Sequence, residues 1–236
     1  MSSIPVTGRP AGLVLAEHGG AADLAAFLAR LLRFDRAAAV RLQAVPGPED
    51  SGVLAVFGRL PLGTSGAIAV RTARLTGAPA GTDATVSAGQ LLDAVDTENG
   101  TVTVPAPVTG PAWAGLLPPR TGWELIAEPS AFEVLPEVTA AVGEFRRRSE
   151  AVPEHHRSRQ VLDALADEIW SRPLGAVPGL PLRAAHAAHV IGFLRPAVPL
   201  TVHRAGGWLR LSAPAGSIAV RSTAAPGAGL GLSPLR

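Results

Sequence analysis

The stretch Ala67-Ile68-Ala69-Val70-Arg71-Thr72 recurs late in the chain as Ser217-Ile218-Ala219-Val220-Arg221-Ser222. A turn rich in glycine and proline precedes each copy, at 61–66 and at 213–216. Such turns use glycine for a positive φ and proline for a fixed φ. The repeat therefore predicts the same local structure twice, a tight turn followed by a strand.

The similarity continues backwards from each turn. Alternation of apolar and polar residues predicts two earlier strands in each copy, and an apolar pattern at helical spacing predicts a helix before them. The predicted elements are 25–33, 40–43, 54–57 and 67–72 in the first copy, and 184–195, 200–203, 208–211 and 217–222 in the second. A helix followed by a three-stranded meander buries one sheet face under its helix.

The sequence therefore predicts an α+β protein of two helix–three-stranded-meander units related by internal duplication, with a mostly helical insert between them. The expected divisions are a loose N-terminal lead (1–20), the first unit (21–75), a loop-rich and helical insert (76–181), the second unit (182–222) and a flexible tail (223–236). The alternative is chance resemblance, because this chain draws on few residue types.

The insert contains two sequences that resemble capping boxes. Ser87-x-x-Gln90 predicts a short helix through residue 95. Ser130-x-x-Glu133 predicts a second helix start, but Pro136 would fall inside that helix, and proline is tolerated in the first turn only. We therefore expect this helix to start near Pro136. The other expected elements are strands at 101–104 and 123–127, a linker or covering loop at 105–122, and a helix at 156–171.

The composition excludes several kinds of site. All 21 basic residues are arginine, and the chain has no cysteine and no tyrosine. Zero cysteine excludes disulfides, thiol catalysis and cysteine-ligated metal. The bias towards Ala, Gly, Pro and Arg is typical of GC-rich coding, so an arginine is weaker evidence of function here than in an average protein.

The charge is unevenly distributed. Residues 1–168 hold all 19 acids and 14 arginines, a net charge of −5, whereas 169–236 hold 7 arginines and no acid, a net charge of +7. A basic segment of this kind indicates contact with nucleic acid, phosphate or an acidic partner. The alternative is that this segment docks on the acidic part of the same molecule.

The arginines of the two copies suggest a shared surface. If Ile68 and Val70 point into the core, Arg71 points to the opposite face, and the same alternation places Arg221 outward in the second copy. Guanidinium groups bind phosphates and aromatic rings stack on bases. The candidate anion- or nucleic-acid-binding residues are Arg41, Arg59, Arg71, His203, Trp208, Arg210 and Arg221. The alternatives are an ordinary solvated face or a face covered by 76–181.

A second basic run lies between two predicted helices and comprises Arg146, Arg147, Arg148, Arg157 and Arg159. It suggests an anion-binding hinge, although such runs are more often solvated helix ends. His186 and His189 share a helix face, but two histidines do not complete a metal site. We expect no metal and no cofactor.

The chain shows no P-loop, nucleophile elbow or His-Glu-x-x-His motif. No apolar run approaches the roughly 20 residues that span a bilayer, and no signal sequence is evident, so we expect a cytoplasmic protein without membrane contact. The leading hypothesis is a non-enzymatic protein whose basic C-terminal third binds nucleic acid or another anionic macromolecule. The alternatives are a protein-interaction or homo-oligomeric scaffold, with the small-residue sheet face as its self-association surface, and an enzyme of unrecognised type.

Overall fold

The computed structural model describes residues 12–63, 65–79 and 81–222. The predicted flexible tail and most of the predicted N-terminal lead lie outside the described residues. Within the described part, a large antiparallel sheet and five α-helices confirm the predicted mixed α+β class. No helix in these residues combines the length and the apolar character needed to cross a bilayer.

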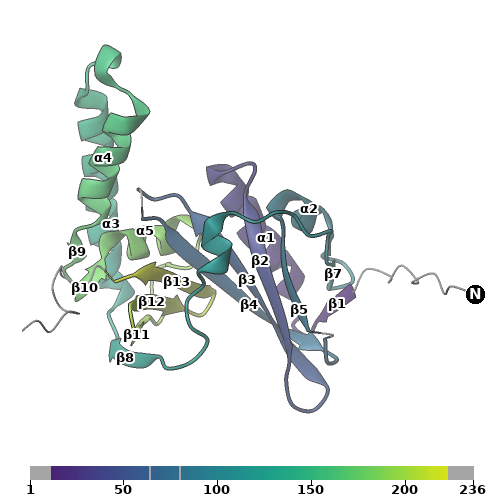
Figure 1. Ribbon diagram of the computed structural model, residues 1–236. Coiled ribbons are helices and arrows are strands. Elements are labelled where there is room, and N and C mark those ends of the chain that lie inside the picture. Colours follow the sequence, from purple (N-terminus) through teal and green to yellow (C-terminus); the bar gives the residue numbers. More distant parts are fainter. Residues whose placement is uncertain (1–11, 64, 80, 223–236) are drawn as a thin grey trace, which may run out of the picture.

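Eight strands form the continuous path of the sheet in the order β5-β2-β3-β4-β13-β12-β11-β8 (Figure 1). Their bounds are β5 Thr82–Ser87, β2 Ala39–Pro46, β3 Ser51–Leu60, β4 Ala67–Thr76, β13 Gly216–Arg221, β12 Trp208–Ala213, β11 Thr201–Ala205 and β8 Glu124–Ala127. The two predicted meanders are therefore both present and lie edge to edge. Strands β5 and β8, which come from the predicted insert, extend the two outer edges.

The repeated sequence forms the centre of this sheet. Strands β4 and β13 are antiparallel neighbours, with Ile68 opposite Ala219 and Ala69 opposite Ile218. The two copies of the Ile-Ala-Val-Arg sequence thus pair with each other across a local twofold centre. On either side of that centre, β3 and β12 continue the sheet in the same order.

Helices α1 (Gly20–Phe34) and α5 (Leu182–Val190) cover one side of the sheet, here called the helix side. Helix α1 buries Leu24, Phe27, Leu28 and Leu31 at helical spacing. Helix α5 ends earlier than predicted, because Gly192 adopts a positive φ of 84° shortly after it. Phe27 stacks on Phe193 at a centroid distance of 5.9 Å, which joins the first half of the core to the second.

Each half also contains a second helix that follows its outer strand. Helix α2 (Ala88–Asp93) follows β5, and its N-terminus is capped by Ser87 as predicted. Helix α3 (Ala131–Ala151) follows β8 and forms a projecting hairpin with α4 (Arg159–Trp170) (Figure 1).

Short strand pairs complete the halves. Strand β1 (Gly12–Leu15) pairs with β7 (Thr101–Thr103), which in turn pairs with β6 (Val95–Asp96), and β9 (Pro173–Leu174) pairs with β10 (Val177–Pro181).

The start predicted for α3 was wrong. The helix begins at Ala131, after a complete capping box between Ser130 and Glu133, and runs through Pro136. Proline costs the bond that its amide would make to the carbonyl four residues earlier. Val134 and Val138 are fully buried on the same helix, so their burial and the cap hold the first two turns despite that loss. The start predicted for α4, residue 156, was also early, because Ser158 caps the helix and its first residue is Arg159.

The predicted covering loop crosses the other side of the sheet, here called the strap side. This strap, residues 105–123, includes the 3₁₀ turn η1 (Ala112–Gly115). Its Trp113, Leu117 and Trp123 pack on a small buried cluster of Phe57, Ile68, Trp208 and Ala219. An amide–carbonyl bond of 2.8 Å from Val108 to Thr85 fixes its start to the edge strand β5. Both sides of the central sheet are therefore covered.

Candidate anion-binding site

Strand register shows which predicted residues share a surface. Residues directly opposite each other in a ladder point to the same side. Arg59 is opposite Ile68, Ile68 is opposite Ala219, Ala219 is opposite Arg210, and Arg210 is opposite His203. One row across the strap side therefore carries two arginines symmetrically placed about the sheet centre.

Arg41, Trp208 and Arg221 lie on the same side as this row. Arg41 is opposite Phe57, and Trp208 is opposite Arg221. The structure thus brings six of the seven predicted site residues to one face.

Arg71 is the exception, and the orientation predicted for β4 was reversed. Ala67 and Ala69 face the helix side, whereas Ile68 packs beneath the strap. The prediction assumed that the larger β-branched residues face the only covered side, but here the strap supplies an apolar cover on the second side. Ala67, Ala69 and Ala219 are all buried, so the small-residue surface expected for self-association is not exposed.

Arg71 therefore lies under the helices. Its Nη2 donates to an Asp23 carboxylate oxygen at 2.7 Å, and its Nη1 donates to the carbonyl of Ala215. This arginine ties α1 in the first half to the β12–β13 turn in the second half. Its side chain is only 13% exposed, and both of its terminal nitrogens already donate within the protein.

Two arginines of the strap side rest on indole rings. The Arg221 guanidinium carbon lies 4.3 Å from the centroid of Trp208, and that of Arg210 lies 4.1 Å from the centroid of Trp123. Such cation–π contacts hold the charge in place without neutralising it. No described carboxylate forms an ion pair with either residue.

Burial alters the titration of the neighbouring groups. It lowers the pKa of Arg210, whose Nε has no hydrogen-bond partner among the described residues. It also lowers the pKa of His203, with a further contribution from the charge of Arg210. His203 is therefore neutral at pH 7 and adds a polar group to this face without adding charge.

Arg41 is different because a carboxylate holds it. Its Nε donates to Asp83 at 2.6 Å and its Nη1 donates to the Thr85 hydroxyl at 3.1 Å. The bond from Arg41 lowers the pKa of Asp83, so this carboxylate stays ionised at neutral pH. The outer edge of the first half is thus electrically compensated.

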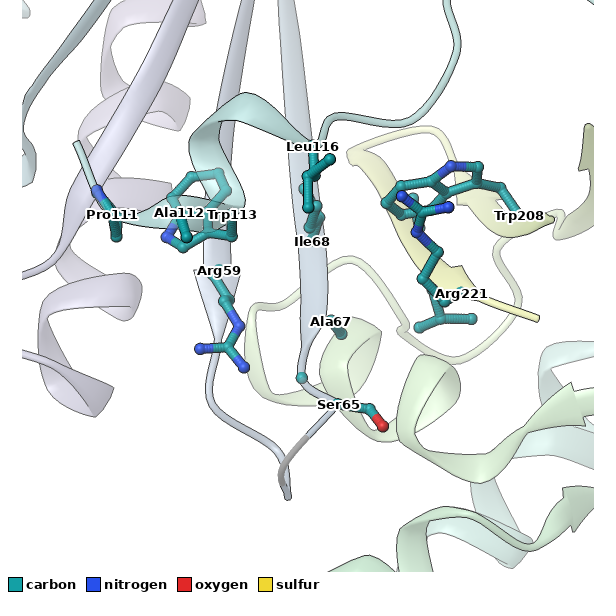
Figure 2. A pocket seen from close by; sticks show the side chains of 13 residues that line it. Arg59, Ser65, Ala67, Ile68, Pro111, Ala112, Trp113, Leu116, Trp208 and Arg221 are labelled. Atoms are coloured by element: carbon teal, nitrogen blue, oxygen red, sulfur yellow. The ribbon is translucent and has the colours of Figure 1, made fainter. Parts of the chain in front are cut away.

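A pocket of about 390 Å³ lies between the strap and the sheet centre, and we call it the Trp208 pocket. Figure 2 shows Arg59 and Arg221 on either side of Ile68, with Trp113 above Arg59 and Trp208 behind Arg221. Leu116 from the strap and Ser65 from the β3–β4 turn complete its outline. Among the described residues that line it, none is acidic.

A smaller pocket of about 220 Å³ lies along the strap and is called the Trp123 pocket. Its walls include Phe57, Val70 and Trp123, and its charged residues are Arg120 and Arg210. No carboxylate is found among its described lining residues either.

Sequence reasoning missed Trp113, Trp123 and Arg120 as site residues, because Trp113 and Arg120 lie in the predicted loop and Trp123 only begins the predicted strand 123–127. A usable signal was present, since two tryptophans occur in a segment of prolines and glycines that offers no core of its own.

The second basic run serves local structure at three of its five positions. Arg148 binds Glu144 and Glu168, Arg157 donates to the Glu150 and Val152 carbonyls at the end of α3, and Arg159 lies 3.6 Å from Asp163. The remaining two, Arg146 and Arg147, are exposed on α3. The run is therefore distributed over the α3–α4 hairpin and does not converge on one point.

Part of the basic C-terminal third docks internally, as the alternative proposed. Arg172 binds Glu144 at 2.7 Å and Glu168 at 3.1 Å. Arg183 is buried and donates to the Arg221 carbonyl at 3.3 Å. The described part of the chain contains no group of three or more His, Cys, Asp or Glu residues suited to a metal ion.

Comparison with known proteins divides the chain at the strap. Residues 9–115 match a family model described as a domain of unknown function, DUF8010, and residues 118–225 match another described as a domain of unknown function, DUF8185. No curated protein matches the chain. Each half of the sheet is therefore similar to its own family, and neither family has an assigned function.

Proposed function

We propose that this chain is a non-enzymatic binding protein that holds nucleic acid or another anionic macromolecule on the strap side of its sheet. The observation that carries the proposal is the placement of Arg210 and Arg221 on tryptophan rings. A stacked guanidinium keeps its N–H edge available for phosphate or carboxylate oxygens. An arginine paired with a carboxylate, such as Arg41 with Asp83, has already used that edge.

The surroundings of these arginines support the same function. The Trp208 and Trp123 pockets have arginines and no acid among their described lining residues, so the local potential favours an anion. Aromatic residues beside basic groups are typical of surfaces that bind single-stranded nucleic acid. The cytoplasmic location expected from the sequence stays part of this proposal.

The test measures binding of a labelled single-stranded oligonucleotide by fluorescence polarisation across a series of salt concentrations. About three phosphate contacts predict that log affinity falls with log salt at a slope of roughly −2. The double variant Arg210→Ala with Arg221→Ala should bind at least tenfold more weakly than the wild type.

The control double variant is Arg36→Ala with Arg204→Ala, which removes the same charge from two exposed positions. Arg204 is opposite Leu209, whose side chain belongs to the helix-side core. Equal weakening by the two double variants would mean that net charge alone attracts the oligonucleotide, and the proposed surface would be wrong.

We also propose that the two halves arose by duplication with a circular permutation. Read from β5, with β7 joined to β1, the first half gives a strand, a helix, the short strands β6, β7 and β1, a helix and a meander. The second half gives the same order of helices and long strands from β8, with α4 added after α3 and the pair β9–β10 in place of the three short strands. The two family matches, one to each half, support this origin. Superposition of β5-α2-α1-β2-β3-β4 on β8-α3-α5-β11-β12-β13 tests this origin, and failure of these elements to align in that order would count against the permutation.

A further inference from the structure

We infer that the Trp208 pocket recognises a single flat ring carrying one anionic group, the chemistry of a nucleoside monophosphate. This inference rests on the proposed function and names the unit of ligand that the pocket holds. It concerns the space between Arg59 and Arg221 beside the sheet centre (Figure 2).

The apolar walls of the pocket favour a ring. Ile68 and Ala219 form its floor on the sheet, and the strap contributes Leu116 and the half-buried indole of Trp113. Aromatic side chains bind the flat faces of bases with little preference among them, at about 1–3 kcal/mol per base. A pocket with these walls selects for a flat apolar group more than for a hydrated anion.

The two guanidinium groups favour an anion next to that ring. Arg221 approaches from β13 with one face against Trp208, so its N–H groups point along the plane of the guanidinium and away from the ring. Arg59 approaches from β3 on the opposite side of Ile68. A phosphate beside Arg221 would accept from the edge of that guanidinium, and the positive charge of Arg59 in the same wall adds to the attraction of the pocket for an anion.

Gly66 makes room for Arg59 in the pocket wall. A Cβ at this position would lie 2.7 Å from Arg59 Nε, and the backbone has a positive φ of 63°. The positive φ favours glycine at this position, and a Cβ would displace the Arg59 side chain from its place in the wall. The turn that precedes the repeated sequence therefore positions one of the two cationic groups.

The size of the pocket limits the ligand. Its volume of about 390 Å³ is near the lower end of the roughly 300–1,000 Å³ typical of small-molecule sites. One ring system with its anionic group fits such a space. The Trp123 pocket, at about 220 Å³, falls below that range, and the Nε of Arg210 beside it is buried.

A nucleoside monophosphate unit occurs both as a free nucleotide and within a nucleic-acid strand. The test therefore uses isothermal titration of the full chain with adenosine 5′-monophosphate, adenosine, inorganic phosphate, octanoate and a single-stranded oligonucleotide. The monophosphate should bind at least tenfold more tightly than adenosine, phosphate or octanoate. Arg221→Gln should reduce its affinity about tenfold, Trp113→Ala should reduce it severalfold, and the control Arg204→Gln should leave it unchanged.

The outcomes separate this inference from the proposed function. Binding of the monophosphate without the oligonucleotide supports the pocket and contradicts a macromolecular ligand. If oligonucleotide binding depends on salt but is unchanged by Trp113→Ala, and the monophosphate binds no more tightly than phosphate, the pocket inference is wrong. The proposed function would still stand. Octanoate binding as tight as that of the monophosphate overturns the requirement for a ring, and failure of every probe to bind overturns both proposals.

Discussion

Around the centre of the sheet, away from the outer-edge pair of Arg41 and Asp83, the two sides use arginine in opposite ways. On the helix side, Arg71 binds Asp23 and the Ala215 carbonyl, and Arg183 is buried against the Arg221 carbonyl. On the strap side, Arg210 and Arg221 lie on tryptophan rings. Hydrogen bonds to carboxylates and carbonyls consume the donors of a guanidinium, whereas an indole supports the flat face and leaves the edge available. The comparison indicates that Arg71 and Arg183 stabilise the fold, and in the proposed function Arg210 and Arg221 are the arginines that serve a ligand.

Substitution of the isoleucines in the repeated sequence should change stability most, and it tests this comparison of the two sides. Ile218 is fully buried in the main core, whereas Ile68 is 7% exposed in the small cluster beside the Trp208 pocket. Ile218→Ala should cost about 3–4 kcal/mol of unfolding free energy, since it leaves a cavity among helices and sheet. Ile68→Ala should cost about 2 kcal/mol, because the strap can settle into the vacated space.

Urea denaturation followed by circular dichroism measures both costs. Equal losses of unfolding free energy for the two variants would show that the strap packs as rigidly as the helices. The two sides of the sheet would then not differ in packing.

Histidine protonation provides a second, smaller contrast. His186 stacks on Trp170 at 4.0 Å, and burial together with the charge of His189 lowers its pKa to about 4. Because the folded state disfavours the charged form, the unfolded chain binds the proton more tightly. Stability is then complete above the ordinary pKa near 6.5 and falls as the pH drops towards 4. The expected loss from this residue is about 2 kcal/mol between pH 7 and pH 5.

Denaturant titrations at pH 7 and pH 5 check this expectation. His186→Phe keeps a ring against Trp170 and should remove most of the loss. His203 on the strap side also has a lowered pKa, so His203→Phe should act in the same direction but less strongly. If His203→Phe reduced the acid-induced loss of stability more than His186→Phe, the conclusion that His186 is the more buried histidine would be wrong.

The sequence allowed the helices, both meanders and the strap to be predicted because each has a local signal. Leucines at helical spacing, glycine and proline in the turns and the Ser87 cap act within a few residues. Which side chains of β4 face the helices and which face the strap could not be predicted in this way. It depends on which side of Ile68 receives a cover, and that cover is Trp113 and Leu117 of a segment without regular periodicity.

The candidate site was predictable to a similar extent. Alternation along β12 and β13 placed Trp208, Arg210 and Arg221 together correctly, since their helix-side neighbours are plainly apolar. The partners of Arg71 could not be read from the chain, because Asp23 lies 48 residues away and the Ala215 carbonyl 144. The same limit applied to the pocket, whose strap residues become neighbours of the sheet only in the folded molecule.

The smallest expected effect on stability separates the two arginines of the repeated sequence. Arg71→Ala removes the hydrogen bonds to Asp23 and to the Ala215 carbonyl on the helix side. It should lower the free energy of unfolding by about 1 kcal/mol, a typical net value for such hydrogen bonds. Arg221→Ala removes an exposed cation–π contact and should cost roughly 0.5 kcal/mol. The order reverses for ligand affinity, which Arg221→Ala should weaken about tenfold while Arg71→Ala leaves it unchanged. Thermal denaturation and titration of the same two proteins measure both quantities. A loss of affinity in Arg71→Ala at full stability would contradict the assignment of structure to one side and recognition to the other, because Arg71 can reach a strap-side ligand only if β4 turns over.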